Sequence, residues 1–497
     1  MKNTLETKMT LSLSETIIKT AKENPRKIAL SDIKESISYD SLIKNITKIS
    51  HFLMEKIKLK RGDAIGIILP NCNLFVKVHL SIVFSGFVSV PLSTEIMSNN
   101  LTEIIKITKL KCIFSFVEII NKNLLEDVIK KNKIFFISDI ELKNKEIKNC
   151  TLKSIIHKDH FIIHKFPKIN LQDPISYMFT SGSTGKKKCV VLTHKNVLSA
   201  IKNIISFVGY DKNYYELITL PIYHNFGLGH IYCNLFVGGK VSILPGFSNF
   251  NLLFNTLFEK RPKGFPGTPS GFKILLQAFP KKFLLCKKFL KLIIINSEPV
   301  PPSLLKQLVN KFPSTRILVY YGLTEASRSS FIEFSNKTEE YLFNSVGKAT
   351  PNVELKIVDK NKKKLKVMQK GTVCIKGDHV MKSYLNIKKK EYFKKDWFHT
   401  DDIGFLDKKN NLFLTGRKSR VINKEGLKFD PVEIENFIKS FNGIKQARIY
   451  LDKKNKIVCS IVVIKSKFKG LDNLKKYCFR KLEKSKIPSN FQIKKIM

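Results

Sequence analysis

One segment in the first half of the chain combines glycines, hydroxyl groups and lysines. Residues Tyr177–Val191 read YMFTSGSTGKKKCVV: a strand-like run ends at Thr180, and a Ser/Gly turn with three lysines follows. Glycines let backbone N–H groups approach an anion closely, while hydroxyl groups and lysines add donors and charge. The segment is not a Walker A loop, because Gly182 and Gly185 are too close in sequence for that motif. It predicts a polyphosphate-binding loop rather than a flexible turn with solvated lysines.

Further short motifs place acidic, aromatic and basic residues along the chain. The motifs are Gly62–Asp63 with Leu69–Asn71, Leu220–His224, Tyr321–Glu325, Trp397–Asp402, and Gly416–Arg417 continued by Gly426, Pro431 and Glu435. Together with the loop at 180–188, their order resembles that of the adenylate-forming superfamily, which includes acyl-CoA synthetases, aryl-CoA ligases, firefly luciferase and the adenylation domains of peptide synthetases. The resemblance implies ATP-dependent activation of a carboxylic acid, fatty or other, as an acyl-adenylate. The acyl group would then pass to coenzyme A or to the phosphopantetheine of an acyl carrier protein.

The resemblance also implies which residues would bind the nucleotide. The loop would hold the β- and γ-phosphates, with Thr184 and Lys186 as the main donors. Tyr321 would stack on adenine, Asp402 would accept hydrogen bonds from the ribose hydroxyls, and Arg417 would support the ribose and an inter-domain hinge. Asp402 and Arg417 could instead be ordinary turn residues. The full predicted set is Thr180, Ser181, Gly182, Ser183, Thr184, Gly185, Lys186, Lys188, Tyr321, Gly322, Asp402 and Arg417.

Three residues are implied at the reacting centre. Joining a carboxylate to the α-phosphate requires that negative charge be neutralised while the reactants are aligned. Glu325 would coordinate Mg²⁺, a hard cation that prefers oxygen ligands. Thr324 would donate to the α-phosphate or the acyl carboxyl group. His224 has two possible roles: it could lie beside the acyl group, or it could be a hydrogen-bonded histidine of the core.

Several positions depart from the family pattern. Lys187 stands where proline is usual and Cys189 where glycine is usual; Asp401 also replaces a glycine, and Asn296 begins a turn where a glycine-rich one is expected. Asn and Asp tolerate left-handed backbone conformations, so Asn296 and Asp401 are compatible with tight turns. Cys189 has no such explanation.

The end of the sequence gives an alternative prediction. Residues 486–491 resemble the run-up to the final "P…GK" motif of the family, whose lysine reaches the reacting carboxylate and the α-phosphate. The sequence ends at Met497, and neither Lys494 nor Lys495 aligns with that lysine. Removing such a charge from a transition state costs orders of magnitude in rate. The alternative is a degenerate protein that binds an adenylate without full catalysis.

The residues between the motifs alternate between strand and helix patterns. An apolar run at 64–69, a helical pattern at 75–87 and a second run at 88–92 predict a βαβ unit in a parallel sheet. The alternation resumes from residue 175 to about residue 334. Short strands from 345 to 414 predict a small β-barrel-like element.

These patterns predict the α/β fold class with two domains. A large N-terminal AMP-binding domain, at 1–416, would consist of βαβ subdomains and the small β element. A small α+β domain would follow at 417–497, and the resemblance implies that this domain is mobile.

Charge and cysteine content bear on nucleic-acid binding, cellular location and membrane contact. The formal net charge is +47, but only nine of the 88 basic residues are arginine, the residue that polyanion-recognition surfaces favour. We expect a solvated lysine-rich surface with no specific nucleic-acid partner, although it would attract anionic ATP and coenzyme A. Nine scattered cysteines without a C-x-x-C pair predict a reduced, cytoplasmic protein. No signal peptide or transmembrane segment is expected, so any membrane contact would be peripheral.

Overall fold

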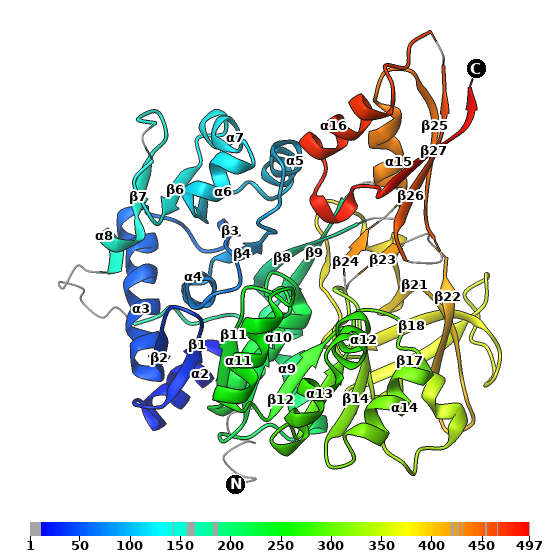
Figure 1. Ribbon diagram of the computed structural model, residues 1–497. Helices are drawn as coiled ribbons and strands as arrows, with labels where there is room; N and C mark the ends of the chain where they lie inside the picture. The colour runs from blue at the N-terminus through cyan, green and yellow to red at the C-terminus, as the bar shows by residue number, and fades with distance from the viewer. Residues whose placement is uncertain are drawn as a thin grey trace.

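The computed structural model describes residues 11–142, 144–156, 165–181, 187–418, 422–424, 427–429, 431–452, 455–464 and 466–496. Two large sheets with their helices form the body, and a smaller antiparallel sheet and a C-terminal unit lie beside them (Figure 1). No helix in the described part of the chain is both long and apolar enough to cross a membrane.

The first large sheet has eight strands, in the order β19-β9-β8-β4-β3-β5-β6-β7. The strands from β8 to β7 run parallel, and β3 is buried along its whole length, as expected for a strand covered on both faces. β9 folds back antiparallel on β8. The strands are β3 (Ala64–Ile68), β4 (Val88–Pro91), β5 (Cys112–Ser115), β6 (Phe135–Ser138), β7 (Asn149–Thr151), β8 (Pro174–Ser181), β9 (Lys187–Thr193) and β19 (Ser383–Tyr384). The helices are α3 (Tyr39–His51), α4 (Asn73–Phe84), α5 (Ser98–Thr108), α6 (Val117–Lys122), α7 (Glu126–Lys131), α8 (Leu152–Ile156) and α9 (His194–Val208).

The second large sheet has nine strands, in the order β16-β15-β14-β13-β12-β10-β11-β1-β2. Its helix α10 is buried on nearly all sides and packs against α2 and α9, so its side chains are apolar around most of the circumference. The strands are β1 (Ile28–Ser31), β2 (Ser36–Ser38), β10 (Tyr215–Ile218), β11 (Lys240–Ile243), β12 (Gly264–Gly267), β13 (Leu292–Ile295), β14 (Arg316–Tyr321), β15 (Ser330–Phe334) and β16 (Lys348–Ala349). The helices are α2 (Leu13–Glu23), α10 (Asn225–Val237), α11 (Phe250–Lys260), α12 (Pro269–Ala278), α13 (Pro280–Leu285) and α14 (Pro302–Lys311).

The remaining elements form an antiparallel sheet and the C-terminal unit. The C-terminal unit has a hydrophobic core of its own, and its hairpin strand β24 contacts β8 (Figure 1). The antiparallel sheet contains β17 (Val353–Val358), β18 (Gly371–Gly377), β20 (Phe393–Lys394), β21 (Trp397–Leu406) and β22 (Leu412–Arg417). The C-terminal unit contains β23 (Ile422–Lys424), β24 (Leu427–Phe429), α15 (Pro431–Lys439), β25 (Ile444–Leu451), β26 (Ile457–Val463), α16 (Leu471–Lys481), the short helix η5 (Lys484–Lys486) and β27 (Asn490–Ile496).

The α/β fold class predicted from the sequence is confirmed. The predicted βαβ unit is β3-α4-β4, but α4 ends at Phe84 rather than at residue 87. The helix stops there because Gly86 takes a left-handed conformation, with φ of +76°. The expected β element is a five-stranded antiparallel sheet. The domain boundary after residue 416 stays a prediction.

Candidate functional site

A cavity lies where both large sheets meet the C-terminal unit, and we call it the first cavity. Thr180 lies at the end of β8, Thr324 follows β14, and His224 is the N-cap residue of α10. Open α/β sheets bind ligands outside the carboxyl ends of their strands, and both strands end here. The space available to water-sized molecules is about 130 Å³. The first cavity therefore gathers one residue from each of three motifs that are far apart in the sequence.

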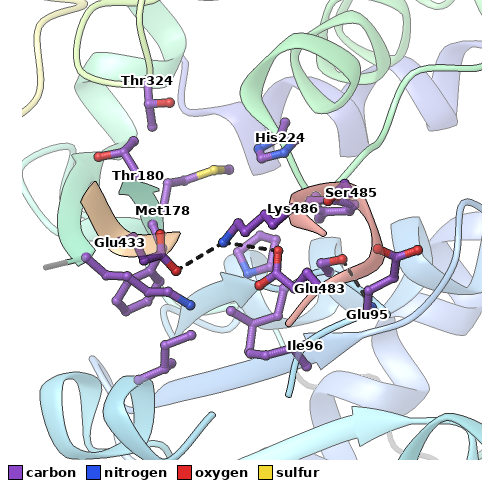
Figure 2. Close-up of a pocket in the computed structure, with 17 residues that line it drawn as sticks. Glu95, Ile96, Met178, Thr180, His224, Thr324, Glu433, Glu483, Ser485 and Lys486 are labelled. Atoms are coloured by element: carbon purple, nitrogen blue, oxygen red, sulfur yellow. Dashed lines mark hydrogen bonds and ion pairs between the residues drawn. The ribbon is translucent and has the colours of Figure 1, made fainter. Parts of the chain in front are cut away.

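Figure 2 shows how these side chains are arranged. Thr180, Thr324 and His224 border the cavity on one side, and Lys486 of the C-terminal unit extends into it. Asn225, the first residue of α10, donates from Nδ2 to the carbonyl oxygen of Thr324 over 3.2 Å. That hydrogen bond joins the start of α10 to the turn after β14. The structure thus brings the predicted residues Thr180, His224 and Thr324 together, although their chemical roles stay predictions.

The predicted phosphate loop connects β8 to β9. Gly182, Ser183, Thr184, Gly185 and Lys186 lie outside the described residues, so their predicted phosphate contacts stay predictions. On either side, Ser181 ends β8, and the Nζ atom of Lys188 in β9 is 5.3 Å from the ring centroid of Tyr384. Thr180 lines the first cavity and Lys188 lines another, so the two residues that flank the loop border different cavities.

This second cavity lies between the turn after β14 and the antiparallel sheet. Its space for water-sized molecules is about 300 Å³, and Lys188, Glu325, Asp401 and Arg417 give it a charged lining. The Tyr384 hydroxyl donates to Oε1 of Glu325 over 2.7 Å. Burial, reinforced by the Glu325 carboxylate, raises the pKa of Tyr384, so its hydroxyl stays protonated and orients Glu325.

The residues around Glu325 show whether this carboxylate could bind the predicted magnesium ion. The described residues contain no cluster of three or more His, Cys, Asp or Glu side chains that could hold a metal. Magnesium, however, is commonly held by one or two carboxylates together with water and the phosphates of a substrate. A single carboxylate in a charged cavity fits an ion that arrives with a nucleotide. The assignment of Glu325 as the metal ligand stays a prediction.

Asp402 is buried between two of the other predicted residues. Its Oδ2 accepts a hydrogen bond of 2.6 Å from the Tyr321 hydroxyl, and its Oδ1 accepts one from Nε of Arg417. Burial alone would lower the pKa of Arg417, but the Asp402 carboxylate raises it overall. Asp402 and Arg417 pair on neighbouring strands β21 and β22, so the alternative that they are turn residues is wrong. Arg417 lines the second cavity and is held there by Asp402.

Most positions that depart from the family pattern do not need the left-handed backbone conformation that favours glycine. Cys189 is buried in β9, opposite Phe179 of β8. Among the described residues with positive φ, neither Asn296 nor Asp401 occurs; Ser297 takes the left-handed conformation instead, with φ of 82°. Neither Asn296 nor Asp401 therefore makes use of the tolerance that Asn and Asp have for the left-handed conformation. Gly322 is needed for space, because a Cβ atom there would lie 2.6 Å from the backbone nitrogen of Arg328.

An ion cluster at the first cavity was not predicted from the sequence. Nζ of Lys486 lies 3.2 Å from Glu433 of α15 and 3.3 Å from Glu483, which precedes η5. Burial would lower the pKa of Lys486, but the two carboxylates raise it overall, so the ammonium group stays charged. Lys187 of β9 lines the same cavity, and burial lowers its pKa. The C-terminal unit thus brings a charged cluster of one lysine and two glutamates to the cavity that Thr180, His224 and Thr324 line.

Comparisons with known proteins agree with this geometry. A family model described as "AMP-binding enzyme" matches residues 17–385. The acyl-CoA ligase sidI of Beauveria bassiana is 27% identical over 84% of this chain and 75% of its own, and 4-coumarate–CoA ligase 2 of Solanum tuberosum is 26% identical over 80% and 73%. Among solved structures, the amide bond synthetase McbA of Marinactinospora thermotolerans has a TM-score of 0.85 at 16% identity, covering 97% of this chain and 95% of that one. An o-succinylbenzoate CoA synthetase of Bacillus subtilis, bound with a product analogue, has a TM-score of 0.80 at 21% identity, covering 96% and 94%.

Proposed function

The chain belongs to the AMP-binding enzyme family, and from that premise we propose that it activates a carboxylic acid with ATP and transfers the acyl group to the thiol of coenzyme A. The proposal is carried by one observation: Thr180, His224 and Thr324 converge on a cavity that also receives the ammonium group of Lys486. The second cavity, with Glu325 and Arg417, lies at the far end of the predicted phosphate loop. Two substrates that must react with each other can therefore bind side by side.

In the first half-reaction, a carboxylate oxygen of the acid attacks the α-phosphorus of ATP. The bond from that phosphorus to the bridging oxygen of the β-phosphate breaks, and pyrophosphate leaves. The hydroxyl of Thr324 would donate to the α-phosphate, and Lys188 and Arg417 would balance negative charge in the second cavity. A magnesium ion held by Glu325 would neutralise phosphate charge when bound. The protein's own contribution is to align the reactants and exclude water.

In the second half-reaction, a thiolate attacks the carbonyl carbon of the acyl-adenylate. The bond from that carbon to the phosphate oxygen breaks, AMP leaves, and a thioester forms. Lys486, paired with Glu433 and Glu483, would hold the C-terminal unit beside the reacting residues while the thiolate approaches. Coenzyme A and carrier proteins both present a thiol at the end of a pantetheine arm. The names of the relatives favour coenzyme A as the acceptor.

The degenerate alternative receives no support from the comparisons. The relatives carry the names of ligases, and the first cavity holds a charged lysine from the C-terminal unit. A cytoplasmic location and a part in fatty acid metabolism stay predictions.

Exchange of labelled pyrophosphate into ATP tests the proposal. The purified protein should catalyse exchange only when a suitable acid is present, because exchange requires reversible formation of the acyl-adenylate. A broad panel of aliphatic, aromatic and dicarboxylic acids should be screened with and without magnesium. Absence of exchange with every acid, in protein shown to be folded, would refute the proposal.

A further inference from the structure

Arg328 is a buried cation that follows the YGLTE motif in the turn between β14 and β15. Its side chain is only 2% exposed. The guanidinium group donates to neutral oxygens: Oγ of Ser327 and the carbonyl oxygens of Asn225, at 3.3 Å, and Phe226, at 3.4 Å. Its Nε has no partner within the described part of the chain. Burying a charge without a counter-charge is costly, so the position of Arg328 requires an explanation.

Glu216, a buried acid that acts on Cys233 and Tyr320 as Arg328 does, has other partners. Glu216 of β10 accepts hydrogen bonds from Asn234, at 2.7 Å, and from Tyr210, and its oxygens lie 3.2 Å from Nδ1 of His230. Among the described residues no ion pair joins Arg328 to a carboxylate. The ring of Tyr320, with its centroid 5.5 Å from Cζ of Arg328, offers only a weaker cation–π attraction.

The surrounding backbone is shaped to admit the guanidinium group. A Cβ atom at Gly229 of α10 would lie 2.1 Å from Nη2 of Arg328, so the absence of a side chain there provides the space. Arg328 itself has a φ of 65°, a conformation that long side chains seldom adopt. Strain of this kind concentrates at functional sites, where the surrounding structure maintains it.

Arg328 faces a small cavity, the Arg328 cavity, that Asn225, Ser327 and His379 also line. The centre of a water-sized molecule can occupy about 20 Å³ of it, which is room for one small polar group. His379, another residue of the lining, is buried, and its Nδ1 has no partner in the described structure. Asn225, which lines the Arg328 cavity, follows His224 in the chain and donates a hydrogen bond to Thr324, so this residue links the Arg328 cavity to the predicted reacting centre.

We propose that Arg328 binds a second carboxylate of the substrate, so that the acid activated by this protein is a short dicarboxylic acid. One carboxylate would react between His224 and Thr324, and the other would pair with the guanidinium group, whose planar donors suit two carboxylate oxygens. A long alkyl chain or an aromatic ring does not fit the Arg328 cavity as it stands. This inference rests on the proposed function, since it names the acid for the same reaction.

The wild-type protein provides the first test. Pyrophosphate exchange is measured with malonic, succinic and glutaric acids and with the monoamide of each, which has nearly the same shape but lacks the second charge. We expect the best diacid to exceed its monoamide by about 100-fold in kcat/KM, because a site built for a charged group rejects a neutral analogue strongly. Equal rates for a diacid and its monoamide, or exchange with long-chain monocarboxylic acids alone, would overturn this inference while upholding the proposed function. Exchange with none of the acids would refute the proposed function itself.

Substitutions then test whether Arg328 binds the second carboxylate. Arg328→Met should raise KM for the diacid and bring the diacid-to-monoamide ratio close to unity, with KM for ATP unchanged. Arg328→Lys should retain part of the ratio, because it keeps the charge but loses the planar donors. Arg316→Met is the matched control: this arginine begins β14, pairs with the exposed Glu333, and should leave the ratio at its wild-type value. Circular dichroism checks folding, and if Arg328→Met does not fold, the Lys variant and the wild-type ratio decide. An unchanged ratio in a folded Arg328→Met variant would overturn the assignment.

Discussion

The second cavity and the Arg328 cavity flank the same turn after β14, but their charges are balanced in different ways. At the second cavity, Glu325 is bonded to Tyr384, and Arg417 is paired with Asp402. In the Arg328 cavity, the cation donates to neutral oxygens and lies against the Tyr320 ring, and the described residues provide no carboxylate partner. Groups that already have partners are held in place for ATP, the substrate that every reaction would share. An unpaired cation is suited to a negative charge that the carboxylic acid would supply. On the proposed function, nucleotide recognition would therefore rest on these partnered groups, and selection of the acid on Arg328 and its neighbours.

The largest expected effect comes from Glu325 in the second cavity. Glu325→Gln keeps the shape of the side chain but removes its charge, and we expect kcat/KM for exchange to fall about a thousandfold. The loss should be the same for every acid, because the residue serves the nucleotide. Glu333→Gln, on the exposed face of β15, is the control and should leave the rate unchanged. A loss confined to some acids would break the distinction between the two cavities.

Asp402 should have the next largest effect. Asp402→Asn removes the counter-charge that holds Arg417, and a charge-assisted hydrogen bond of this kind contributes about 2 kcal/mol. We therefore expect KM for ATP to rise about 30-fold, with little change in KM for the acid. Steady-state kinetics with each substrate varied in turn measures both. An increase in the acid KM alone would mean that Asp402 belongs functionally to the acyl side.

Gly229→Ala should act on the other side of the turn. The added methyl group would collide with Nη2 of Arg328 and displace the guanidinium group from its cavity. We expect the diacid-to-monoamide ratio to fall about tenfold while KM for ATP stays constant. Gly246→Ala is a suitable control, because no heavy atom lies within 4 Å of the position of its Cβ. An increase in KM for ATP in the Gly229 variant would show that the two sides are coupled through the turn.

The smallest expected effect comes from two histidines, one in each cavity, whose pKa values are lowered. Burial lowers the pKa of His379, in the Arg328 cavity, to about 4, and burial together with nearby lysines lowers that of His399, in the second cavity, also to about 4. Both pKa values lie below the unfolded value of about 6.5, so the unfolded chain takes up protons first as the pH falls. The free energy of unfolding should therefore decrease between about pH 6.5 and pH 4, by roughly 2 kcal/mol at pH 5 for His379.

Salt should separate the two histidines. High salt screens lysine charges and should raise the pKa of His399 by a fraction of a unit, whereas a shift caused by burial should change little. NMR titration of ring-labelled histidine at low and high salt measures both values. Equal responses would contradict the different origins assigned to the two shifts.

The sequence was sufficient for the features that local patterns encode. Buried runs and turn residues predicted the α/β class, and ordered motifs predicted that Thr180, His224 and Thr324 act together. The convergence itself followed from a general property of α/β sheets, in which strand ends meet at one edge. Errors arose at boundaries such as the end of α4, where a left-handed glycine rather than the hydrophobic pattern ends the helix.

Other features depend on burial and long-range packing, which local sequence does not reveal. A lone arginine after a motif is usually a solvated turn residue, so only the three-dimensional packing of α10 reveals Arg328 as a buried cation. Lys486 and Glu433 belong to separate segments and form an ion pair only when the C-terminal unit has folded. The pairing of Tyr384 with Glu325 likewise joins β19 to a turn far away in the sequence.

The products of one complete reaction test the central claim most directly. ³¹P NMR can follow ATP while mass spectrometry follows thioester formation in a mixture of protein, magnesium, coenzyme A and a short diacid. We predict that AMP and pyrophosphate appear in equal amounts, matched by one acyl thioester for each ATP consumed. Formation of ADP and phosphate, or release of AMP without a dependence on the acid, would contradict the account.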